Sequence, residues 1–444
     1  MATIPGSQLF DATAGVQTVN IVEFSSGTPA NPGANGLFNL EVFLGATPPN
    51  PTLAPGFQGL AVLGNGGHSI DLLSGAFAVT DISSNNNILT ASGTGQTITG
   101  GSGIEIMTAN GAADLVNGGS GNDLIYLNGL NDIFNGAAGG NDQVYVNGTG
   151  GSASAGGGND YIQIAGSGNT ADAGAGNDQV NVTGTNNLIA TGFGNDTVFV
   201  QANNDTVNAQ AGADQIIMFG NSDVVNGSVN STQVQIQGNN DTFTGASTGG
   251  ADNVFLFGNN GLVSGGTGTG NDTIFVQGTG DTVTGGGGTN TINVFGSGNT
   301  VNSGTGNGTY NDFGAADTVN AGAQASTYNV FGAGSRLNAS SANDTVSLFA
   351  ANDTVNVGTG SQTINMYAGG EVLNTQTATG YQDTVVGFIK GSDTVKLDGT
   401  TNTATGVVAT ATLVNAGQDT KVTLAGGSTI VFKGITSIDT GFFS

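Results

Sequence analysis

A repeat of nine residues runs through most of this chain and constrains its fold more than any other feature. Its clearest copy is GGSGNDLIY, residues 118–126, in which Asp123 follows a glycine turn and precedes alternating apolar residues. Counted from Asp123, an acidic or amide residue recurs at steps of mostly nine across residues 84–378. Chains with such a short, sustained period form repeat architectures in which each unit packs only against its neighbours.

Units of two kinds alternate along the chain, so the structural period is about 18 residues. One kind continues as a longer strand, as in DLIYLNG (123–129), and the other turns sooner, as in DIFNGAAG (132–139). In the first strand Ile125 and Leu127 point to one side and Tyr126 to the other. A strand this short cannot bury its apolar side alone, but coils stacked at about 4.8 Å bury a continuous narrow core.

The predicted fold class is therefore all-β, a parallel β-solenoid (β-roll) of about 18-residue coils with a small β cap at each end. The solenoid covers residues 84–378. Residues 1–83 lack the nine-residue phase and are expected to form an N-terminal β cap or assembly domain. Residues 379–444 are expected to form a C-terminal β cap, which reads as hairpins over residues 411–444.

The charge of the chain is one-sided, with 31 acidic and 5 basic residues and a formal net charge of −26. Residues 1–335 contain no Lys or Arg. Such a surface repels nucleic-acid phosphates and anionic lipid headgroups, so we expect no nucleic-acid partner. No apolar run approaches the roughly 18 residues of a spanning helix, so we expect no membrane insertion. The same charge attracts cations.

The recurring aspartates predict a cation site. In a solenoid, equivalent residues such as Asp123 and Asp142 lie in one column about 4.8 Å apart, and like charges that close destabilise the stack. Ca²⁺ binds six to eight oxygens from carboxylates and backbone carbonyls, and glycines let a turn adopt positive φ and aim its carbonyls inward. Each unit is therefore predicted to form half of a calcium cage that the next coil completes.

The stretch GGSGNDLIY also resembles the RTX, or hemolysin-type, calcium-binding nonapeptide G-G-x-G-x-D-x-U-x, which it matches at every position. Further copies, with leading glycines replaced, are AGGGNDYIQ (155–163), AGAGNDQVN (173–181), TGFGNDTVF (191–199) and TGTGNDTIF (267–275). The resemblance is most specific over residues 118–214, and it implies several Ca²⁺ ions as the cofactor. The metal-binding residues that it implies are Gly118, Gly119, Gly121, Asp123, Gly140, Asp142, Gly156, Gly158, Asp160, Gly174, Gly176, Asp178, Gly192, Gly194, Asp196, Gly212, Asp214, Gly268, Gly270 and Asp272.

The second edge of the coils departs from this pattern. Asn169, Asn187 and Asn299 stand at its phase positions and are neutral. Calcium is therefore expected mainly along one edge and mainly in the N-terminal two thirds of the repeat. The alternative is a metal-free solenoid whose Asp and Asn side chains only cap turns.

Two further columns are expected to stack. Asparagines one coil apart, such as Asn302 and Asn320, are expected to hydrogen-bond along the column. An aromatic column either fills the core or forms an exposed contact strip. Its members are Phe295, Phe313, Phe331, Phe349 and Tyr367.

The segment 383–444 is similar to the C-terminal segment of RTX proteins exported by type I secretion. The similarity rests on D-x-V-x-x-F-x-x-G-x-D-x-V-x-L (383–397), GGSTIVFKGI (426–435) and GFFS (441–444). It implies an extracellular or cell-surface protein of a Gram-negative bacterium, with the type I secretion machinery as a partner. No Sec-type signal peptide is visible in MATIPGSQLF, which fits that expectation. The alternative is that this segment is only a folded cap.

The residue types disfavour catalysis. The chain has one histidine, His68, no Cys, and no motif for a nucleophile or a phosphate loop, so we expect no enzymatic activity. We expect a secreted, calcium-ordered structural protein that self-associates into an extracellular filament, surface layer or matrix. The alternative is a monomeric RTX-type adhesin or ligand-binding module for a host surface, a polysaccharide or ice.

Overall fold

A computed structural model of the chain describes residues 84–137, 139–376, 380–398 and 401–444, together with shorter pieces before residue 84. Those pieces are residues 8–11, 16–24, 38–43, 54, 56–62, 69–72 and 78–81. His68 and residues 83, 378 and 379, where the sequence predicts domain boundaries, lie outside the described residues. The chain forms two compact units, residues 1–218 and 219–444, and each is considered by itself.

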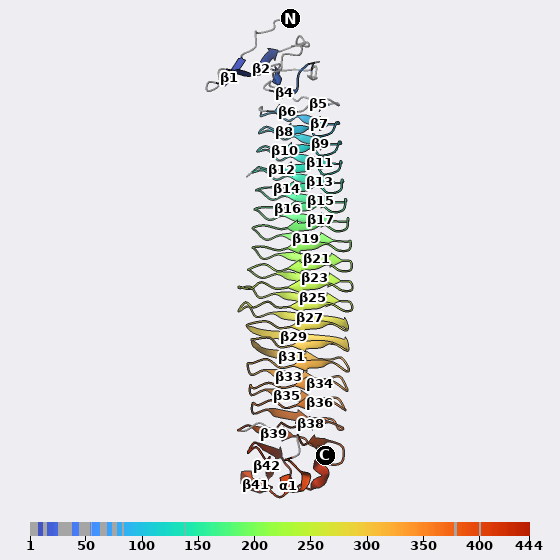
Figure 1. Ribbon diagram of the computed structural model, residues 1–444, viewed down its shortest axis with the longest axis vertical. Helices are drawn as coiled ribbons and strands as arrows, with labels where there is room; N and C mark the ends of the chain where they lie inside the picture. Colours follow the sequence, from blue (N-terminus) through green and yellow to red (C-terminus); the bar gives the residue numbers. More distant parts are fainter. Residues whose placement is uncertain are drawn as a thin grey trace. The chain divides into compact units, whose positions relative to one another are not determined.

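In the first unit the chain alternates between two sheets of mostly parallel strands, sheet A and sheet B. Each coil contributes one strand to each sheet (Figure 1). In sheet B, β11 (Leu124–Leu127) pairs in parallel with β9 (Ile106–Ala109) and β13 (Gln143–Val146). Sheet B also contains β5 (Ser69–Leu72), β7 (Ile88–Ala91), β15 (Tyr161–Ile164), β17 (Gln179–Val182), β19 (Thr197–Val200) and β21 (Gln215–Phe219).

The strands of sheet A in this unit are mostly one residue shorter. There β10 (Leu115–Asn117) pairs in parallel with β8 (Thr97–Thr99) and β12 (Ile133–Asn135). Sheet A also contains β1 (Gln8–Asp11), β2 (Val16–Phe24), β3 (Phe38–Phe43), β4 (Gly59–Val62), β6 (Ala78–Asp81), β14 (Ser152–Ser154), β16 (Thr170–Asp172), β18 (Leu188–Ala190) and β20 (Thr206–Asn208). Of these pairings, only β1 with β2 is antiparallel among the described strands.

The second unit repeats the arrangement. In sheet B, β31 (Asn307–Asp312) pairs in parallel with β29 (Thr289–Ser297) and β33 (Thr327–Val330). The other parallel strands of sheet B are β23 (Gln233–Gln237), β25 (Asn253–Phe257), β27 (Thr273–Thr279), β35 (Thr345–Leu348), β37 (Thr363–Met366) and β39 (Gln382–Val386). Sheet A contains β22 (Val224–Asn226), β24 (Thr242–Thr244), β26 (Leu262–Ser264), β28 (Thr282–Thr284), β30 (Thr300–Asn302), β32 (Thr318–Asn320), β34 (Arg336–Asn338), β36 (Thr354–Asn356), β38 (Val372–Asn374) and β40 (Thr394–Lys396).

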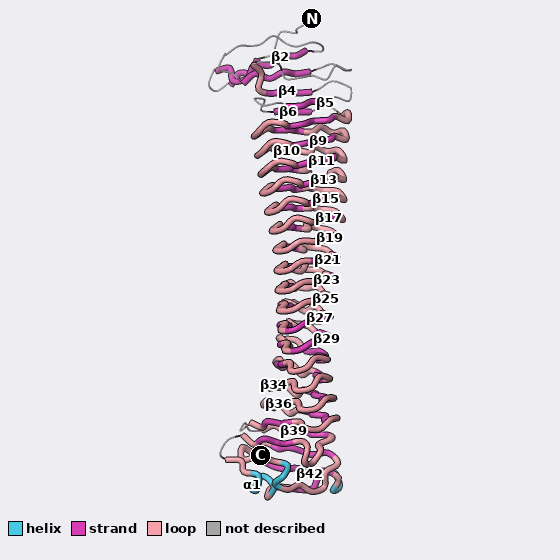
Figure 2. The backbone as a smooth tube through the Cα atoms, turned by 90° about the vertical axis from the view of Figure 1, so that its right-hand side faces the viewer, coloured by secondary structure: helices cyan, strands magenta, loops and turns pink. Residues whose placement is uncertain are grey.

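Sheet B ends in antiparallel strands in the second unit. Strand β39 pairs in parallel with β43 (Thr429–Lys433). Strand β42 (Asp419–Thr423) pairs in antiparallel with both β41 (Thr412–Val414) and β43, so the expected hairpins are present. The five-residue helix α1 (Ala404–Val408), absent from the prediction, lies beside them (Figure 2). Two 3-10 turns, η1 (Asn415–Gly417) and η2 (Thr440–Phe442), complete this region.

The core of each unit is the narrow space between its two sheets. In β11, Ile125 and Leu127 are buried while Leu124 and Tyr126 are partly exposed, as the alternation predicts. The middle residue of each three-residue strand of sheet A is buried in the same way, as Val116 is in β10. Parallel register at steps of about 18 residues confirms the predicted β-solenoid. No described helix has the length and apolar character needed to cross a membrane.

The aromatic column lies outside the core. Phe313, Phe331 and Phe349 are 41%, 40% and 42% exposed, and Tyr367 is 63% exposed. The core-filling interpretation is therefore wrong, because these positions alternate with the inward ones along each strand. The predicted asparagine column is present: the Asn320 side chain donates to Asn302 at 2.9 Å.

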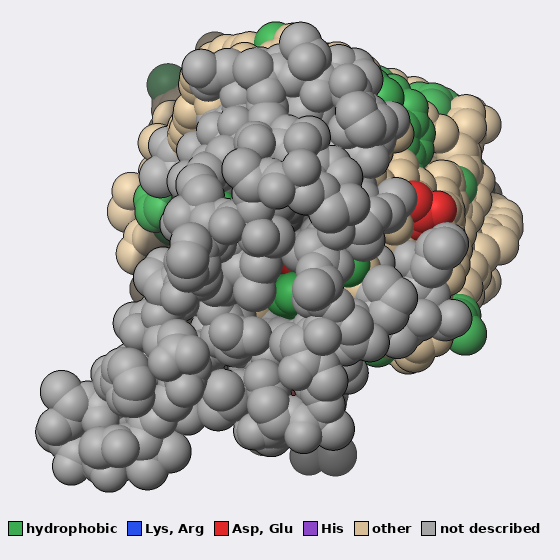
Figure 3. All heavy atoms as spheres, turned by 90° about the horizontal axis from the view of Figure 1, so that it is seen from above, with side chains coloured by type: hydrophobic (Ala, Val, Ile, Leu, Met, Phe, Trp, Pro, Cys, Tyr) green, Lys and Arg blue, Asp and Glu red, His purple; other side chains and the backbone are tan. Residues whose placement is uncertain are grey.

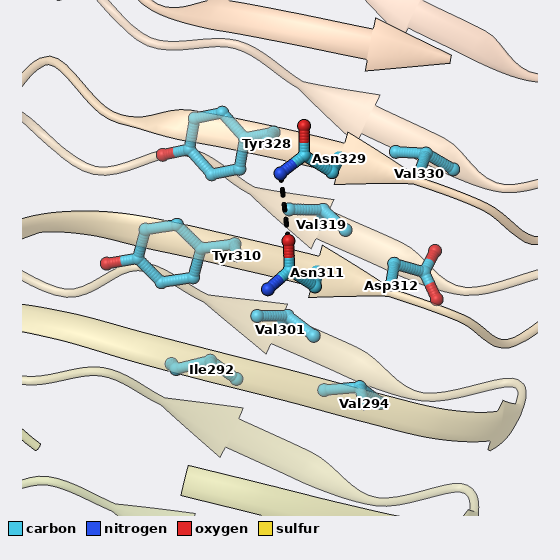
Figure 4. A pocket seen from close by; sticks show the side chains of 10 residues that line it. All are labelled: Ile292, Val294, Val301, Tyr310, Asn311, Asp312, Val319, Tyr328, Asn329 and Val330. Carbon is cyan, nitrogen blue, oxygen red and sulfur yellow. Dashed lines mark hydrogen bonds between the residues drawn. The ribbon is translucent and has the colours of Figure 1, made fainter. Parts of the chain in front are cut away.

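One stretch of the second core is polar. Tyr310 and Tyr328 stack inside it at a centroid distance of 5.0 Å (Figure 4). The Tyr310 hydroxyl donates to the carbonyl oxygen of Ser303, and the Tyr328 hydroxyl lies 2.7 Å from the hydroxyl of Ser303. Asp312 occupies the inward position that Val294 and Val330 hold in the adjacent coils. It is 3% exposed, so a carboxyl group replaces an apolar side chain in this core.

Candidate metal centre

The aspartates predicted to bind calcium form a buried column in the first unit. Each lies directly before a strand of sheet B, and each is at most 3% exposed. The structure therefore brings together the side chains that the sequence places one coil apart. They are Asp123, Asp142, Asp160, Asp178, Asp196 and Asp214. Asp272 takes the same position in the second unit, before β27, and is 2% exposed.

Each carboxylate of this column accepts a hydrogen bond from the main chain of the preceding coil. The N–H of Asp160 donates to Oδ1 of Asp178 at 2.7 Å, and the N–H of Asp178 donates to Oδ1 of Asp196 at 2.8 Å. The N–H groups of Asp123, Asp142 and Asp196 donate in the same way at 2.8, 2.7 and 3.0 Å. These bonds join consecutive coils, and the sequence reasoning did not foresee them.

The neutral residues of the second edge accept the same kind of main-chain hydrogen bond. The N–H of Asn169 donates to Oδ1 of Asn187 at 2.9 Å, and the N–H of Asn187 donates to Asp205 at 2.7 Å. An amide also stands in for a carboxylate on the edge of the aspartate column: in the second unit the N–H of Asp272 donates to Oδ1 of Asn290 at 2.8 Å. What the phase positions share is thus an acceptor oxygen, and this is why Asp and Asn alternate there. That shared oxygen was the signal available in the sequence.

The second oxygen of several column carboxylates is buried without a hydrogen-bond partner. This holds for Oδ2 of Asp160, Asp178, Asp214 and Asp272. No basic residue can neutralise those in the first unit, since residues 1–335 contain none. In the end-on view, acidic but no basic side chains are visible among the described atoms (Figure 3). A buried, uncompensated carboxylate costs several kcal/mol unless a proton or a cation neutralises it.

Burial raises the pKa of these carboxyl groups. Loss of hydration, reinforced by the charges of its neighbours in the column, raises the pKa of Asp160 to about 7. The same cause raises the pKa of Asp178 and Asp214 to about 6 and that of Asp272 to about 7. Main-chain hydrogen bonds oppose the shift without cancelling it. The column therefore has a deficit of positive charge near neutral pH.

The glycine corners place carbonyl oxygens where side chains would otherwise stand. Gly176 has φ +143°, and a Cβ there would lie 1.6 Å from the carbonyl oxygen of Gly158. Gly174 has φ +101°, with the carbonyl oxygen of Gly156 at 2.0 Å from such a Cβ. Only glycine fits either position. Positive φ recurs at the predicted residues Gly119, Gly140, Gly156, Gly158, Gly192, Gly194 and Gly212.

Four predicted glycines have no positive φ. A Cβ at Gly121 or Gly270 would still lie 1.5 or 1.9 Å from a carbonyl oxygen of the preceding coil. A Cβ at Gly268 would meet the main-chain nitrogen of Gly249 at 2.7 Å, and one at Gly118 would meet the ring of Phe134 at 3.3 Å. Oδ2 of Asp123 lies 3.5 Å from the same Cβ position, so Gly118 also stands beside the carboxylate column.

The donor set suits a hard cation. Within the described ranges, no three Asp, Glu, His or Cys side chains converge on one point. An ion bound at these corners would therefore combine a few carboxylate oxygens with main-chain carbonyls, as Ca²⁺ commonly does. Buried unpaired oxygens, close-packed carbonyls and the absence of nearby basic residues in the sequence all fit Ca²⁺.

Comparison with known families supports this chemistry. The family model for the RTX calcium-binding nonapeptide repeat matches residues 99–134, 164–198, 181–216, 267–292 and 332–363. These ranges contain most of the predicted metal residues, and the last extends beyond the part where the sequence pattern is clearest. The stretch 140–160, with Gly140, Asp142 and Asp160, lies between two matches. No curated protein matches the chain.

Proposed function

Since the chain is an RTX repeat protein, whose repeats bind several calcium ions, we propose that it is a secreted structural protein ordered by calcium. In this proposal the ordered protein self-associates into an extracellular filament, surface layer or matrix. The observation that carries the proposal is the buried aspartate column, in which Oδ2 of Asp160, Asp178 and Asp214 has neither a hydrogen bond nor a basic partner.

The chain's own residues divide the task of holding the ion. The aspartates before the sheet B strands would supply carboxylate oxygens, and the glycine corners would supply carbonyl oxygens. The ion, when bound, supplies positive charge that offsets the desolvation of the carboxylates. Because each carboxylate also accepts a main-chain bond from the preceding coil, its position is fixed before any ion arrives.

The site of folding follows from the calcium supply. Cytosolic calcium is too low to fill sites of the affinity found in extracellular modules, whereas millimolar calcium outside the cell fills them. We propose export through a type I secretion system, supported by the resemblance of residues 383–444 to the exported segment of RTX proteins. The chain would then order after leaving a Gram-negative cell.

Two measurements on the full-length protein test this proposal. Circular dichroism with millimolar Ca²⁺ and with excess chelator should show a stronger β signal and a higher melting point with calcium. Sedimentation velocity in calcium should show association that grows with protein concentration. An unchanged spectrum and melting point in chelator would falsify the calcium part. A monomer at every concentration would contradict self-association and leave the adhesin alternative.

A further inference from the structure

A strip of stacked aromatic side chains lies on the outer face of sheet B in the second unit. We call Phe295, Phe313, Phe331, Phe349 and Tyr367 the aromatic ladder. Consecutive rings lie 4.5–4.8 Å apart at interplanar angles of 5–9°. The last four are 40–63% exposed. A continuous apolar strip over successive coils is thus exposed to solvent. Such exposed strips are typical of association surfaces.

The face that carries the ladder has no outward charge. Beside Phe313 stand Thr309 and Asn311, and beside Phe331 stand Thr327 and Asn329. The other outward residues on β29, β35 and β37 are Thr289, Thr291, Asn293, Ser297, Thr345, Ser347, Thr363 and Asn365. The whole chain has a net charge of −26, so two copies repel unless they meet at a face without carboxylates.

Stacking also decides which partner suits the ladder. Each ring face within it is covered by the next ring, so the ladder presents ring edges. A sugar ring packs on an open aromatic face, which the ladder offers only at Tyr367, since the ring of Phe275 lies 4.9 Å from that of Phe295. Ring edges pack well against the rings of another aromatic row. A second copy of this chain supplies such a row with the same spacing.

We propose that the aromatic ladder is the contact through which two copies of this chain associate side by side. The proposal rests on the self-association proposed above and names its surface. A two-fold axis places the same strip on both copies, so a row repeating at 4.5–4.8 Å meets an identical row. The rings are already fixed by stacking, so association costs little side-chain entropy.

The test compares two double variants of the full-length protein in millimolar calcium. Phe331→Ser with Phe349→Ser removes two central rings. Ile133→Ser with Leu188→Ser is the control, because these side chains are 44% and 41% exposed on sheet A of the first unit. Sedimentation velocity over a concentration series gives the dissociation constant. The ladder variant should associate at least about tenfold more weakly than the wild type, and the control within about twofold.

Failure of this inference is distinguishable from failure of the proposed function. If the wild type and the ladder variant associate equally, the ladder is not the contact, although self-association stands. If the wild type stays monomeric at all concentrations, self-association and the ladder contact fall together. Weakened association in a ladder variant that retains the wild-type spectrum and melting point supports the inference.

A second readout does not require removal of any ring. The chain has no cysteine, so Asn329→Cys introduces a single thiol beside the ladder. A short bismaleimide should then trap covalent dimers in calcium. Thr170→Cys, on the exposed side of sheet A, should give few. Association of Asn329→Cys without preferential trapping would overturn the inference.

Discussion

The main-chain N–H of Asp160 donates to Oδ1 of Asp178 at 2.7 Å, whereas Oδ2 of Asp178 is buried without a hydrogen-bond partner. The two oxygens of one carboxylate therefore have different surroundings. One joins consecutive coils, and the other is available to a cation. Substitution can separate these two roles.

Asp178→Asn keeps an acceptor oxygen and removes the charge. In chelator this variant should be as stable as the wild type or more stable, because no buried charge is left uncompensated. In calcium it should gain less stability than the wild type. Urea unfolding with and without calcium measures both effects.

Asp178→Ala removes the acceptor as well, and should lose about 1–3 kcal/mol even in chelator. Asp71→Ala, which removes an exposed carboxylate of β5, is the control and should change neither value much. Equal behaviour of Asp178→Asn and Asp178→Ala under both conditions would refute the division of roles.

The stability of the calcium-free protein should depend on pH. Burial raises the pKa of Asp160 and Asp272 to about 7 from an ordinary value of 3.8. The folded state then binds more protons than the unfolded chain, so stability is lost as pH rises from about 4 to about 7. Urea midpoints in chelator should fall over that interval.

With calcium present the trend should reverse, because protons compete with the cation for the same oxygens. The same urea series in millimolar calcium checks this. A calcium-free midpoint that does not change with pH would mean that the carboxylates are hydrated rather than buried.

Replacing Asp312 should stabilise the second unit. The carboxyl groups of Asp312 and Asp317 interact, and burial followed by this contact raises the pKa of Asp317 to about 8. Asp312→Val restores the apolar column of Val294 and Val330, and should stabilise the protein by about 1–4 kcal/mol. The advantage should grow between pH 7 and 9, where Asp317 of the wild type loses its proton. Thermal melts of the wild type and of Asp312→Val at pH 7 and pH 9 test this. Melting points that change equally with pH in the two proteins would contradict it.

Gly176→Ala should be much more damaging than Gly168→Ala. Both residues have positive φ, but a Cβ at Gly168 meets nothing within 4 Å, whereas one at Gly176 would lie 1.6 Å from a carbonyl oxygen. Gly168→Ala carries only the backbone strain of about 1–2 kcal/mol. Gly176→Ala must also displace the adjoining coil, and should abolish the calcium-dependent transition of that region. Comparable melting points for the two variants would show that the corner is not close-packed.

The stacking of coils could be predicted because side-chain alternation and a fixed period leave few other folds. Ile125 and Leu127 lie inward, and Asn320 bonds Asn302, as the pattern indicates. The main-chain bond to Asp178 could not be predicted from charge alone. Repulsion between the aspartates predicts a cation, but it does not predict the hydrogen bond that the acceptor oxygen of Asp or Asn forms.

The outward position of the aromatic column could have been predicted, because alternation along the strand places Phe295 opposite to Ile292 and Val294. Two other features could not be predicted. Asp312 breaks the inward apolar pattern, and no local signal shows that a buried Asp317 lies beside it. Helix α1 is only five residues long, and its short Ala-Thr-Gly-Val-Val sequence has no apolar periodicity to announce it.

Because the coils between Asp123 and Asp214 bond to one another through the same backbone-to-carboxylate link, the junction between coils is nearly identical along this column. Excision of a segment of one full period, such as residues 161–178, would bring Asp160 against Asp196 and recreate the link that was removed. Gene duplication or deletion in whole-coil steps therefore offers this lineage a way to adjust molecular length without inventing a new interface.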